Sequence, residues 1–364
     1  MVAIRRKDQI TMQGDGIYAS VSDGPRAVVN GLTNQVVASA FETGHVGRSH
    51  PFVFADFGSA DGLIAQDLIT SLVSAIRRET STQPISIHAT DLPTADFRPL
   101  FARLASADSY LSTFDNVFAS SCGLSFFQPL FPPNGLHLGF SASAMHYLSA
   151  VPASLKAKLH SANATGAEVD QYKEQASTDW EAIVMSRSAE LAPGGRMIIA
   201  LLGIDEEGRH LGNTDGHNLF AVYEELWQGL ARDGYITADE FETAVFQQHY
   251  RTKDEIEKPF INNGIAKRAG CSLVSLRSQV VGCPFRNKWL KTNDDQSFAR
   301  RFVATHRSWT STVFENALKN RRDPNERSAI INLLYKRYEE KVLKEPHLHR
   351  KDLVHWIVEF EKRG

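Results

Sequence analysis

In the first two hundred positions, continuous apolar runs alternate with segments whose apolar residues have helical spacing. Segments 27–41, 63–78 and 97–104 carry apolar residues at the spacing of one helix face. Short apolar runs, typical of strands buried on both faces, occupy 51–58, 85–91, 117–121, 136–141 and 196–202. Because helices separate most of these strands, the pattern favours a parallel sheet with crossover helices.

The pattern changes after Gly203. Helical spacing with interspersed charges is found in 219–230 and 237–245, and amphipathic helices are expected again from position 297. Residues 271–281 alternate weakly, and 353–360 alternate like a final strand. We therefore predict an α/β core over 1–210, a mainly helical cap over 211–340, and a C-terminal segment, 341–364, that rejoins the sheet.

Composition narrows the function classes. The 364 residues include 42 acidic and 40 basic side chains, so a formal charge of -2 gives no field for binding a nucleic acid. Three cysteines without a CxxC pair predict neither a disulfide scaffold nor a zinc site. The charged start lacks the apolar stretch of a signal peptide, and no run of about 18 apolar residues predicts a membrane span. We expect a cytoplasmic protein with no membrane partner.

Two carboxylates follow successive strands. Asp56 ends the run at 51–58 and precedes a turn with Gly58 and Gly62, while Asp91 ends the next strand. The carboxyl ends of parallel strands are where doubly wound folds bind ligands, although a strand-to-helix turn with a capping acid has the same appearance. A dinucleotide site requires GxGxxG and an acid about 20 residues further on, which this chain lacks. S-adenosylmethionine carries no phosphates, so the spacing favours it over a nicotinamide cofactor.

Six segments in order carry a resemblance to one family. They are 12–22, the cofactor turn 56–62, Thr-Asp-Leu-Pro-Thr-Ala-Asp-Phe at 90–97, Ser-Phe-Phe with Leu-Phe-Pro within 125–132, Ser-Ala-Met-His-Tyr-Leu-Ser-Ala-Val-Pro at 143–152, and Arg-Ser-Ala-Glu-Leu-Ala-Pro-Gly-Gly-Arg-Met at 187–197. Together they resemble the salicylate/benzoate/theobromine (SABATH) methyltransferases, which use S-adenosylmethionine. The resemblance implies a class I methyltransferase-like α/β fold, with a doubly wound, mainly parallel sheet whose helical cap forms the acceptor pocket.

The resemblance also implies roles for particular residues. The acceptor would contact Ser143, His146 and Tyr147, which would share a face if their segment is helical. No catalytic general base is required, because a carboxylate is ionised at neutral pH. A homodimer is left open. The implied cofactor residues are Tyr18, Ser22, Asp56, Gly58, Ser59, Asp91, Leu92, Ser125 and Phe126.

Departures from the family pattern leave alternatives open. Family carboxyl methyltransferases carry a Gln a few residues past the position of Ser22, where this chain has Gly-Pro-Arg-Ala at 24–27. Ser143 and Tyr147 stand where the family has Tyr and Trp, which predicts an acceptor larger or more polar than benzoate. The metal-binding segment of some members has no counterpart before Tyr250, so we predict no metal. The leading function is methyl ester formation on a small organic acid. The alternatives are an N- or phenol O-methyltransferase acting on a heteroaromatic acceptor, and a cofactor-binding scaffold with altered chemistry. For His146 itself, the alternative is a half-buried structural histidine whose hydrogen bonds go to the backbone rather than to the acceptor.

Overall fold

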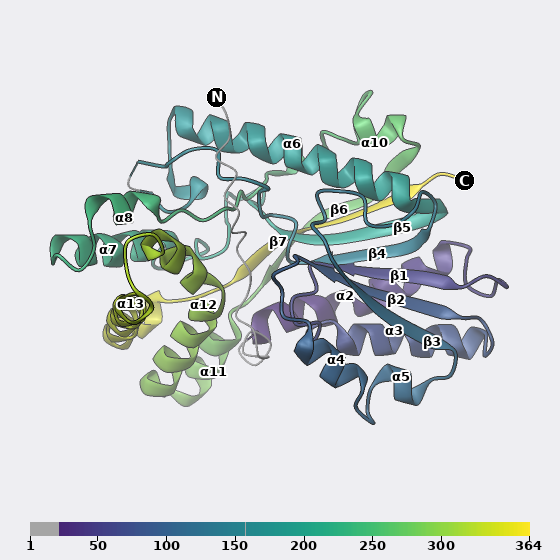
Figure 1. The fold of residues 1–364 in the computed structure, drawn as a ribbon, viewed down its shortest axis with the longest axis horizontal. Coiled ribbons are helices and arrows are strands. Elements are labelled where there is room, and N and C mark those ends of the chain that lie inside the picture. The colour runs from purple at the N-terminus through teal and green to yellow at the C-terminus, as the bar shows by residue number, and fades with distance from the viewer. Residues whose placement is uncertain (1–21, 157) are drawn as a thin grey trace.

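The structure, a computed structural model, describes residues 22–156 and 158–364. Its centre is a seven-stranded sheet in the order β3-β2-β1-β4-β5-β7-β6 (Figure 1). Five neighbouring strands run parallel, and β7 runs antiparallel to both β5 and β6. The strands are β1 Phe52–Phe57, β2 Ile85–Asp91, β3 Val117–Gly123, β4 Leu136–Ala142, β5 Leu191–Leu202, β6 Cys271–Val281 and β7 Leu353–Lys362.

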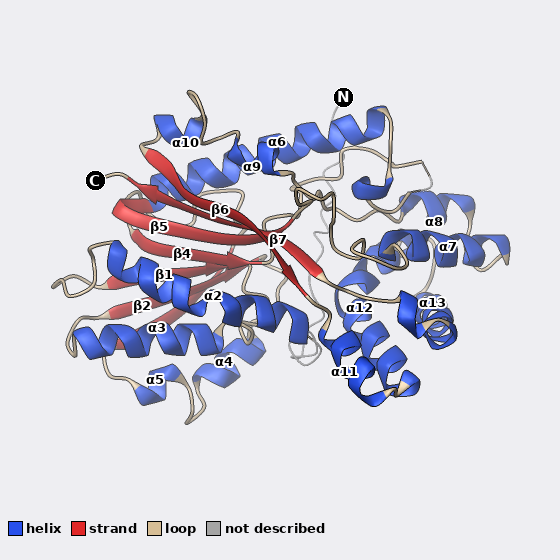
Figure 2. Ribbon diagram, turned by 180° about the vertical axis from the view of Figure 1, so that it is seen from behind, coloured by secondary structure: helices blue, strands red, loops and turns tan. Residues whose placement is uncertain are grey.

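Helices cover both faces of the sheet (Figure 2). Leu32, Val36 and Leu72 of one layer pack in the same apolar cluster as Phe54 of β1. On the other face, Trp180 and Ile183 pack with the strands. The first layer holds α2 Asp23–Glu42, α3 Gln66–Glu79, α4 Arg98–Leu104 and α5 Tyr110–Thr113, and the second holds α6 Ala167–Glu190, α9 Lys253–Glu257 and α10 Ile265–Arg268.

The remaining helices gather beyond one end of the sheet (Figure 1). Their apolar residues, such as Trp227 and Phe314, belong to the same continuous cluster as the α2–α3 layer, so cap and core share one interior. The division at residues 210 and 340 therefore stays a prediction. These elements are η1 Ser161–Asn163, α7 Leu219–Arg232, α8 Ala238–Thr243, α11 Pro284–Thr292, α12 Asp295–Leu318, α13 Pro324–Lys344 and η2 Pro346–Leu348.

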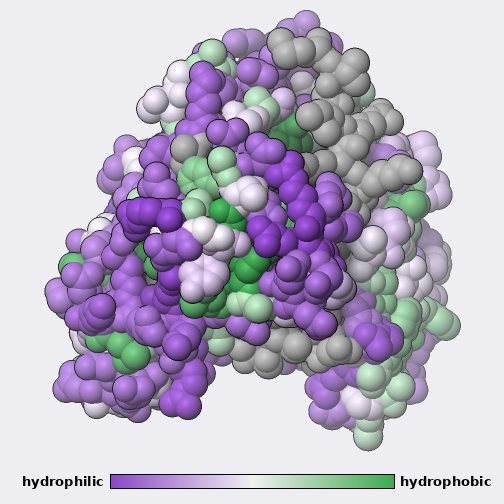
Figure 3. Space-filling view, turned by 60° about the vertical axis from the view of Figure 1, so that its left-hand side comes forward, coloured by the Kyte–Doolittle hydropathy of each residue, from purple (hydrophilic) through white to green (hydrophobic). Residues whose placement is uncertain are grey.

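The predicted strands are confirmed, including the weak one at 271–281 and the last one at 353–360, which the structure extends to Lys362 and places between β5 and β6. The long helix α6 was missed. Where the chain is described, we find no helix both long and apolar enough to cross a membrane. Figure 3 shows a mostly hydrophilic face on which hydrophobic side chains gather near the middle.

Candidate active site

The turn after β1 brings the backbone close to its neighbours. Gly58 has a φ of 76°, a conformation that L side chains rarely adopt, and a Cβ there would lie 2.3 Å from Cβ of Ala144. The amides of Gly58 and Ser59 both donate to the carbonyl of Thr90, at 2.8 and 3.0 Å. Two hydrogen bonds therefore hold the turn after β1 against the end of β2. Only glycine at position 58 allows the backbone to approach Ala144 this closely.

Asp56 and Asp91 lie at adjacent strand ends, as the sequence predicted. Asp56 pairs with Ala89 in the β1–β2 register and is only 5% exposed. Burial, together with the nearby charge of Asp91, raises the pKa of Asp56 to about 7. Burial also raises the pKa of Asp91. Two buried carboxylates that resist ionisation favour a ligand that brings positive charge.

Asp91 is held in a fixed orientation by the turn. One carboxylate oxygen accepts from the Ala60 amide at 2.6 Å, and the other accepts from the Leu92 amide at 2.7 Å. Each oxygen keeps a lone pair, so the carboxylate can still accept from two hydroxyls of a ribose. Ser59 Oγ is buried and has no hydrogen-bond partner among the described residues, which leaves a polar group for a ligand.

The predicted Ser125 and Phe126 lie on the loop after β3. The Phe126 ring lies near the turn, with Cε1 3.9 Å from the position that a Gly58 Cβ would take. An aromatic ring beside a close-approach glycine can pack on a flat base such as adenine. Tyr18 lies outside the described residues, and Ser22 is buried at the start of α2.

A buried ion pair fixes this loop. Arg187, at the end of α6, donates to both oxygens of Glu190 at 2.6 and 2.7 Å, and also to the carbonyl of Phe126 at 2.8 Å. Glu190 in turn accepts from the amides of Leu130 and Phe131. Sequence reasoning saw these residues only as part of a family motif. Their positions show that they hold the predicted adenine-side loop.

These features fit S-adenosylmethionine. Asp91 offers two oriented acceptor oxygens for a ribose, and Asp56 offers a carboxylate for a cationic amino acid group. Ser59 supplies an unpaired hydroxyl, and the turn supplies no nest of amides for phosphates. The fit rests on the raised pKa of Asp56 and the unpaired Ser59 hydroxyl rather than on the turn sequence alone.

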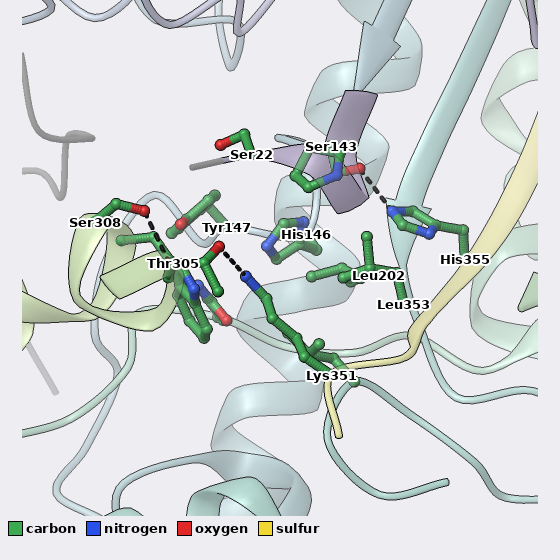
Figure 4. Close-up of a pocket in the computed structure, with 14 residues that line it drawn as sticks. Ser22, Ser143, His146, Tyr147, Leu202, Thr305, Ser308, Lys351, Leu353 and His355 are labelled. Atoms are coloured by element: carbon green, nitrogen blue, oxygen red, sulfur yellow. Dashed lines mark hydrogen bonds between the residues drawn. The ribbon is translucent and has the colours of Figure 1, made fainter. Parts of the chain in front are cut away.

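A cavity opens at the carboxyl ends of β4 and β5, beneath α12 (Figure 4). Its empty volume is about 490 Å³ when the open solvent at its mouth is included. The predicted acceptor residues Ser143, His146 and Tyr147 all line it. Ser22 also lines it, although the resemblance placed that residue on the cofactor. The other lining residues are Pro25, Leu202, Leu211, Gln248, Thr305, Ser308, Trp309, Lys351, Leu353 and His355.

The histidines of the cavity are neutral at pH 7. Burial, with His355 and Arg251 nearby, lowers the pKa of His146 well below its usual value, and its Nδ1 has no partner among the described residues. Burial lowers the pKa of His355 to about 3. His355 Nε2 shares a hydrogen bond of 2.6 Å with Ser143 Oγ. A neutral imidazole can donate through one nitrogen and accept through the other.

The segment carrying Ser143, His146 and Tyr147 is a turn rather than the helix considered from its spacing. Residues 246–251 hold it from the side. Tyr147 forms an antiparallel bridge with Gln248, and buried Arg251 donates to the carbonyl of Met145 at 3.0 Å. The three side chains therefore reach one cavity through tertiary contacts, not through helical periodicity.

From the sequence, we predicted that no metal binds at the segment before Tyr250. Within 22–156 and 158–364, one group of three metal-capable side chains comes together, at His45, His50 and His137. It lies beside the amino ends of β1 and β4, away from the cavity. The Val53 amide donates to His137 Nδ1, so in the neutral ring Nε2 carries the hydrogen and its lone pair is not free for a metal. The absence of a metal requirement stays a prediction.

Sequence reasoning missed several cavity residues. Trp309, Lys351 and His355 were not singled out as pocket residues from the sequence. His355 lies in the alternating strand pattern of β7, and Lys351 lies among other charged residues two positions before that strand. Only the pairing of β7 beside β5 brings them to the end of β4.

The sheet order, with carboxylates at the ends of β1 and β2, defines a class I S-adenosylmethionine-dependent methyltransferase. Residues 8–363 match the family of SAM-dependent carboxyl methyltransferases, and the chain belongs to that family. Gibberellic acid methyltransferase 2 of Arabidopsis thaliana is 24% identical over 269 residues, which is 67% of this chain and 69% of that protein.

Two further comparisons agree with this assignment. Salicylate carboxymethyltransferase of Clarkia breweri is 26% identical over 265 residues, which is 69% of this chain and 72% of that protein. A solved structure of loganic acid methyltransferase with SAH aligns over 98% of this chain and 99% of its own, with a TM-score of 0.76 and 20% identity. At that identity the structural match supports the fold.

Proposed function

We propose that the protein methylates the carboxylate of a small organic acid, using S-adenosylmethionine bound at the ends of β1 and β2. The observation that carries this proposal is the junction of the two sites. Ala144, next to acceptor residue Ser143, lies against Gly58 of the cofactor turn. The names of the relatives, which include salicylate and gibberellic acid methyltransferases, support a carboxylic acid as acceptor.

When bound, S-adenosylmethionine supplies a methyl group that its positively charged sulfur already activates, and transfer to a carboxylate oxygen leaves the neutral thioether S-adenosylhomocysteine. The protein need only orient the acceptor and exclude water. Asp56 and Asp91 hold the donor end. At the acceptor end, the neutral imidazole of His146 can donate one hydrogen bond to the carboxylate without neutralising it. A carboxylate is ionised at neutral pH, so no proton has to be removed.

The lining of the cavity suits a negatively charged acceptor and keeps water away from the reacting atoms. Leu202, Leu211 and Leu353 line it, and no described residue that lines it carries a carboxylate. An acceptor carboxylate therefore meets no like charge there, and its attraction to a sulfonium is stronger than in water. The same apolar lining excludes water from the reacting atoms.

Methyl-labelled S-adenosylmethionine and a mixed panel of acceptors test the proposal. The panel should hold carboxylic acids, the corresponding carboxamides, phenols and ring-nitrogen heterocycles of similar size. We expect label on one or more acids and none on their carboxamides. Label on heterocycles or phenols alone would assign the other methyltransferase chemistry, and binding of the cofactor without any transfer would favour the scaffold alternative.

A further inference from the structure

Lys351 contributes a buried ammonium group to the acceptor cavity. The residue lies two positions before β7 and is only 7% exposed. Among the described residues that line the cavity, Lys351 is the only one with a side chain charged at neutral pH, because burial lowers the pKa values of His146 and His355. The methyl-transfer chemistry described above does not use this charge.

The ammonium group has few partners within the protein. Its Nζ lies 3.5 Å from Oγ1 of Thr305 and 5.3 Å from the ring centre of Trp309. Among the described residues, no carboxylate contributes to its electrostatic surroundings, although an ammonium can donate three hydrogen bonds. Burial lowers the pKa of Lys351 to about 8, so most of the group still carries its charge at pH 7.

Trp309 adds a second unused donor to the same wall. The residue is 7% exposed, and its Nε1 has no acceptor among the described residues. A buried ammonium with one long hydrogen bond and a buried N–H without an acceptor are costly in free energy, so a ligand or ordered water usually completes such groups. Both groups are donors, so together they fit an anionic or strongly accepting group.

The position of Lys351 distinguishes its role from that of the residues near the cofactor. Figure 4 shows Ser22 and Ser143 on one side of the cavity, Lys351 bonded to Thr305 of α12 on another, and His146 and Tyr147 drawn between them. The methyl group must arrive from the side of Ser143, because Ala144 contacts the cofactor turn. Lys351 therefore faces the part of the acceptor that does not react.

We propose that the acceptor is a dicarboxylic acid, whose second carboxylate binds Lys351 and the Trp309 N–H while the first is methylated. This proposal rests on the proposed function and adds the acceptor class. An ammonium paired with the reacting carboxylate would reduce its nucleophilicity, whereas the same ammonium at the remote carboxylate fixes register and discriminates against acids with one charge. The product is a monomethyl ester.

Matched pairs of acceptors test the proposal on the wild-type protein. Each pair consists of a dicarboxylic acid and its monoamide, over a series of chain lengths and of aromatic spacers. For the spacer that fits, we expect kcat/KM for the diacid to exceed that for the monoamide by about 10- to 100-fold, as for other hydrogen bonds to a charged group. A monoamide as good as its diacid at every spacer length would overturn the proposal.

Two variants assign the preference to Lys351. Lys351→Met keeps the length of the side chain and removes the charge, and Lys351→Gln does so with a polar end in case the methionine variant does not fold. Each should abolish the preference for the diacid by raising KM for the diacid, with KM for the monoamide nearly unchanged. Lys291→Met, at an exposed position of α11 that does not line the cavity, also removes one positive charge and should leave the preference intact.

The outcomes separate this inference from the proposed function. If acids are methylated but Lys351→Met keeps the diacid preference, Lys351 does not bind the second carboxylate. If Lys351→Met lowers kcat equally for both members of a pair, the ammonium acts on the reacting carboxylate and the proposal is wrong. If no acid of any kind accepts the label, the proposed function itself fails.

Discussion

Lowering the pH through neutrality should weaken cofactor binding, because it protonates Asp56. Burial and the charge of Asp91 raise the pKa of Asp56 from 3.8 to about 7 in the empty site. Only the ionised carboxylate attracts the ammonium of the cofactor's amino acid end. Below pH 7, binding must therefore release a proton, and each further pH unit should raise Kd by up to tenfold, about 1.4 kcal/mol.

The same carboxylate should affect the stability of the empty protein in the opposite direction. Its pKa is higher in the folded state than in the unfolded state, so the folded state is favoured at low pH and that advantage is lost as pH rises from about 4 to about 7. A shift of about three units corresponds to about 4 kcal/mol at most. Asp56→Asn, which carries no charge, should stabilise the empty protein at pH 8 while weakening cofactor binding.

Calorimetric titration with S-adenosylhomocysteine between pH 5.5 and 8.5 tests both statements, with thermal unfolding measured at the same pH values. Repeating the titrations in buffers of different ionisation enthalpy measures the protons released. Asp67→Asn, on the exposed side of α3, is the matched control for loss of one negative charge. A Kd that stays constant down to pH 5.5, or an Asp56→Asn variant that binds like the wild type, would refute this account of the site.

Other predictions follow from the contacts. Asp91→Ala should weaken cofactor binding by about 1.5–3 kcal/mol, through loss of hydrogen bonds to a charged group, and calorimetry showing unchanged affinity in a folded variant would contradict it. Arg187→Leu leaves the carboxylate of Glu190 buried and unpaired, and should cost about 3–5 kcal/mol in urea unfolding; a loss below 1 kcal/mol would show that the pair is not essential. His146→Ala should lower kcat/KM for the acceptor with cofactor affinity nearly unchanged, whereas unchanged acceptor kinetics would make His146 structural. Activity should survive EDTA, whereas loss that magnesium restores would show a divalent-metal requirement and contradict the prediction made from the segment before Tyr250.

The sequence was most informative where each element has a regular pattern. The runs at 85–91 and 136–141 are buried strands, and the carboxylates after β1 and β2 lie together because parallel strands end at one edge. The helix α6 escaped detection because its buried face includes Arg187 and Glu190, whose charges interrupt the apolar period. They pair with each other, but their further partners, Phe126, Leu130 and Phe131, are on a distant loop, so only the tertiary structure explains why they are buried.

The acceptor cavity, in contrast, could be predicted only in part from the sequence. Ser143, His146 and Tyr147 have helical spacing, but a bridge to Gln248 and the hydrogen bond from Arg251 hold their segment as a turn. The residues that complete the cavity come from α12 and the start of β7, more than 150 positions further along the chain. No local pattern distinguishes such residues from ordinary helix and strand positions.

The chemical nature of the product tests the central claim most directly. The acceptor that reacts best should be incubated with methyl-labelled S-adenosylmethionine, and the purified product should then be treated with mild alkali. A methyl ester is hydrolysed under these conditions, so the account predicts that the label is released as methanol and that the original acid is recovered. Label that stays on the product after alkali would show N-methylation or ether formation, and would contradict carboxyl methylation.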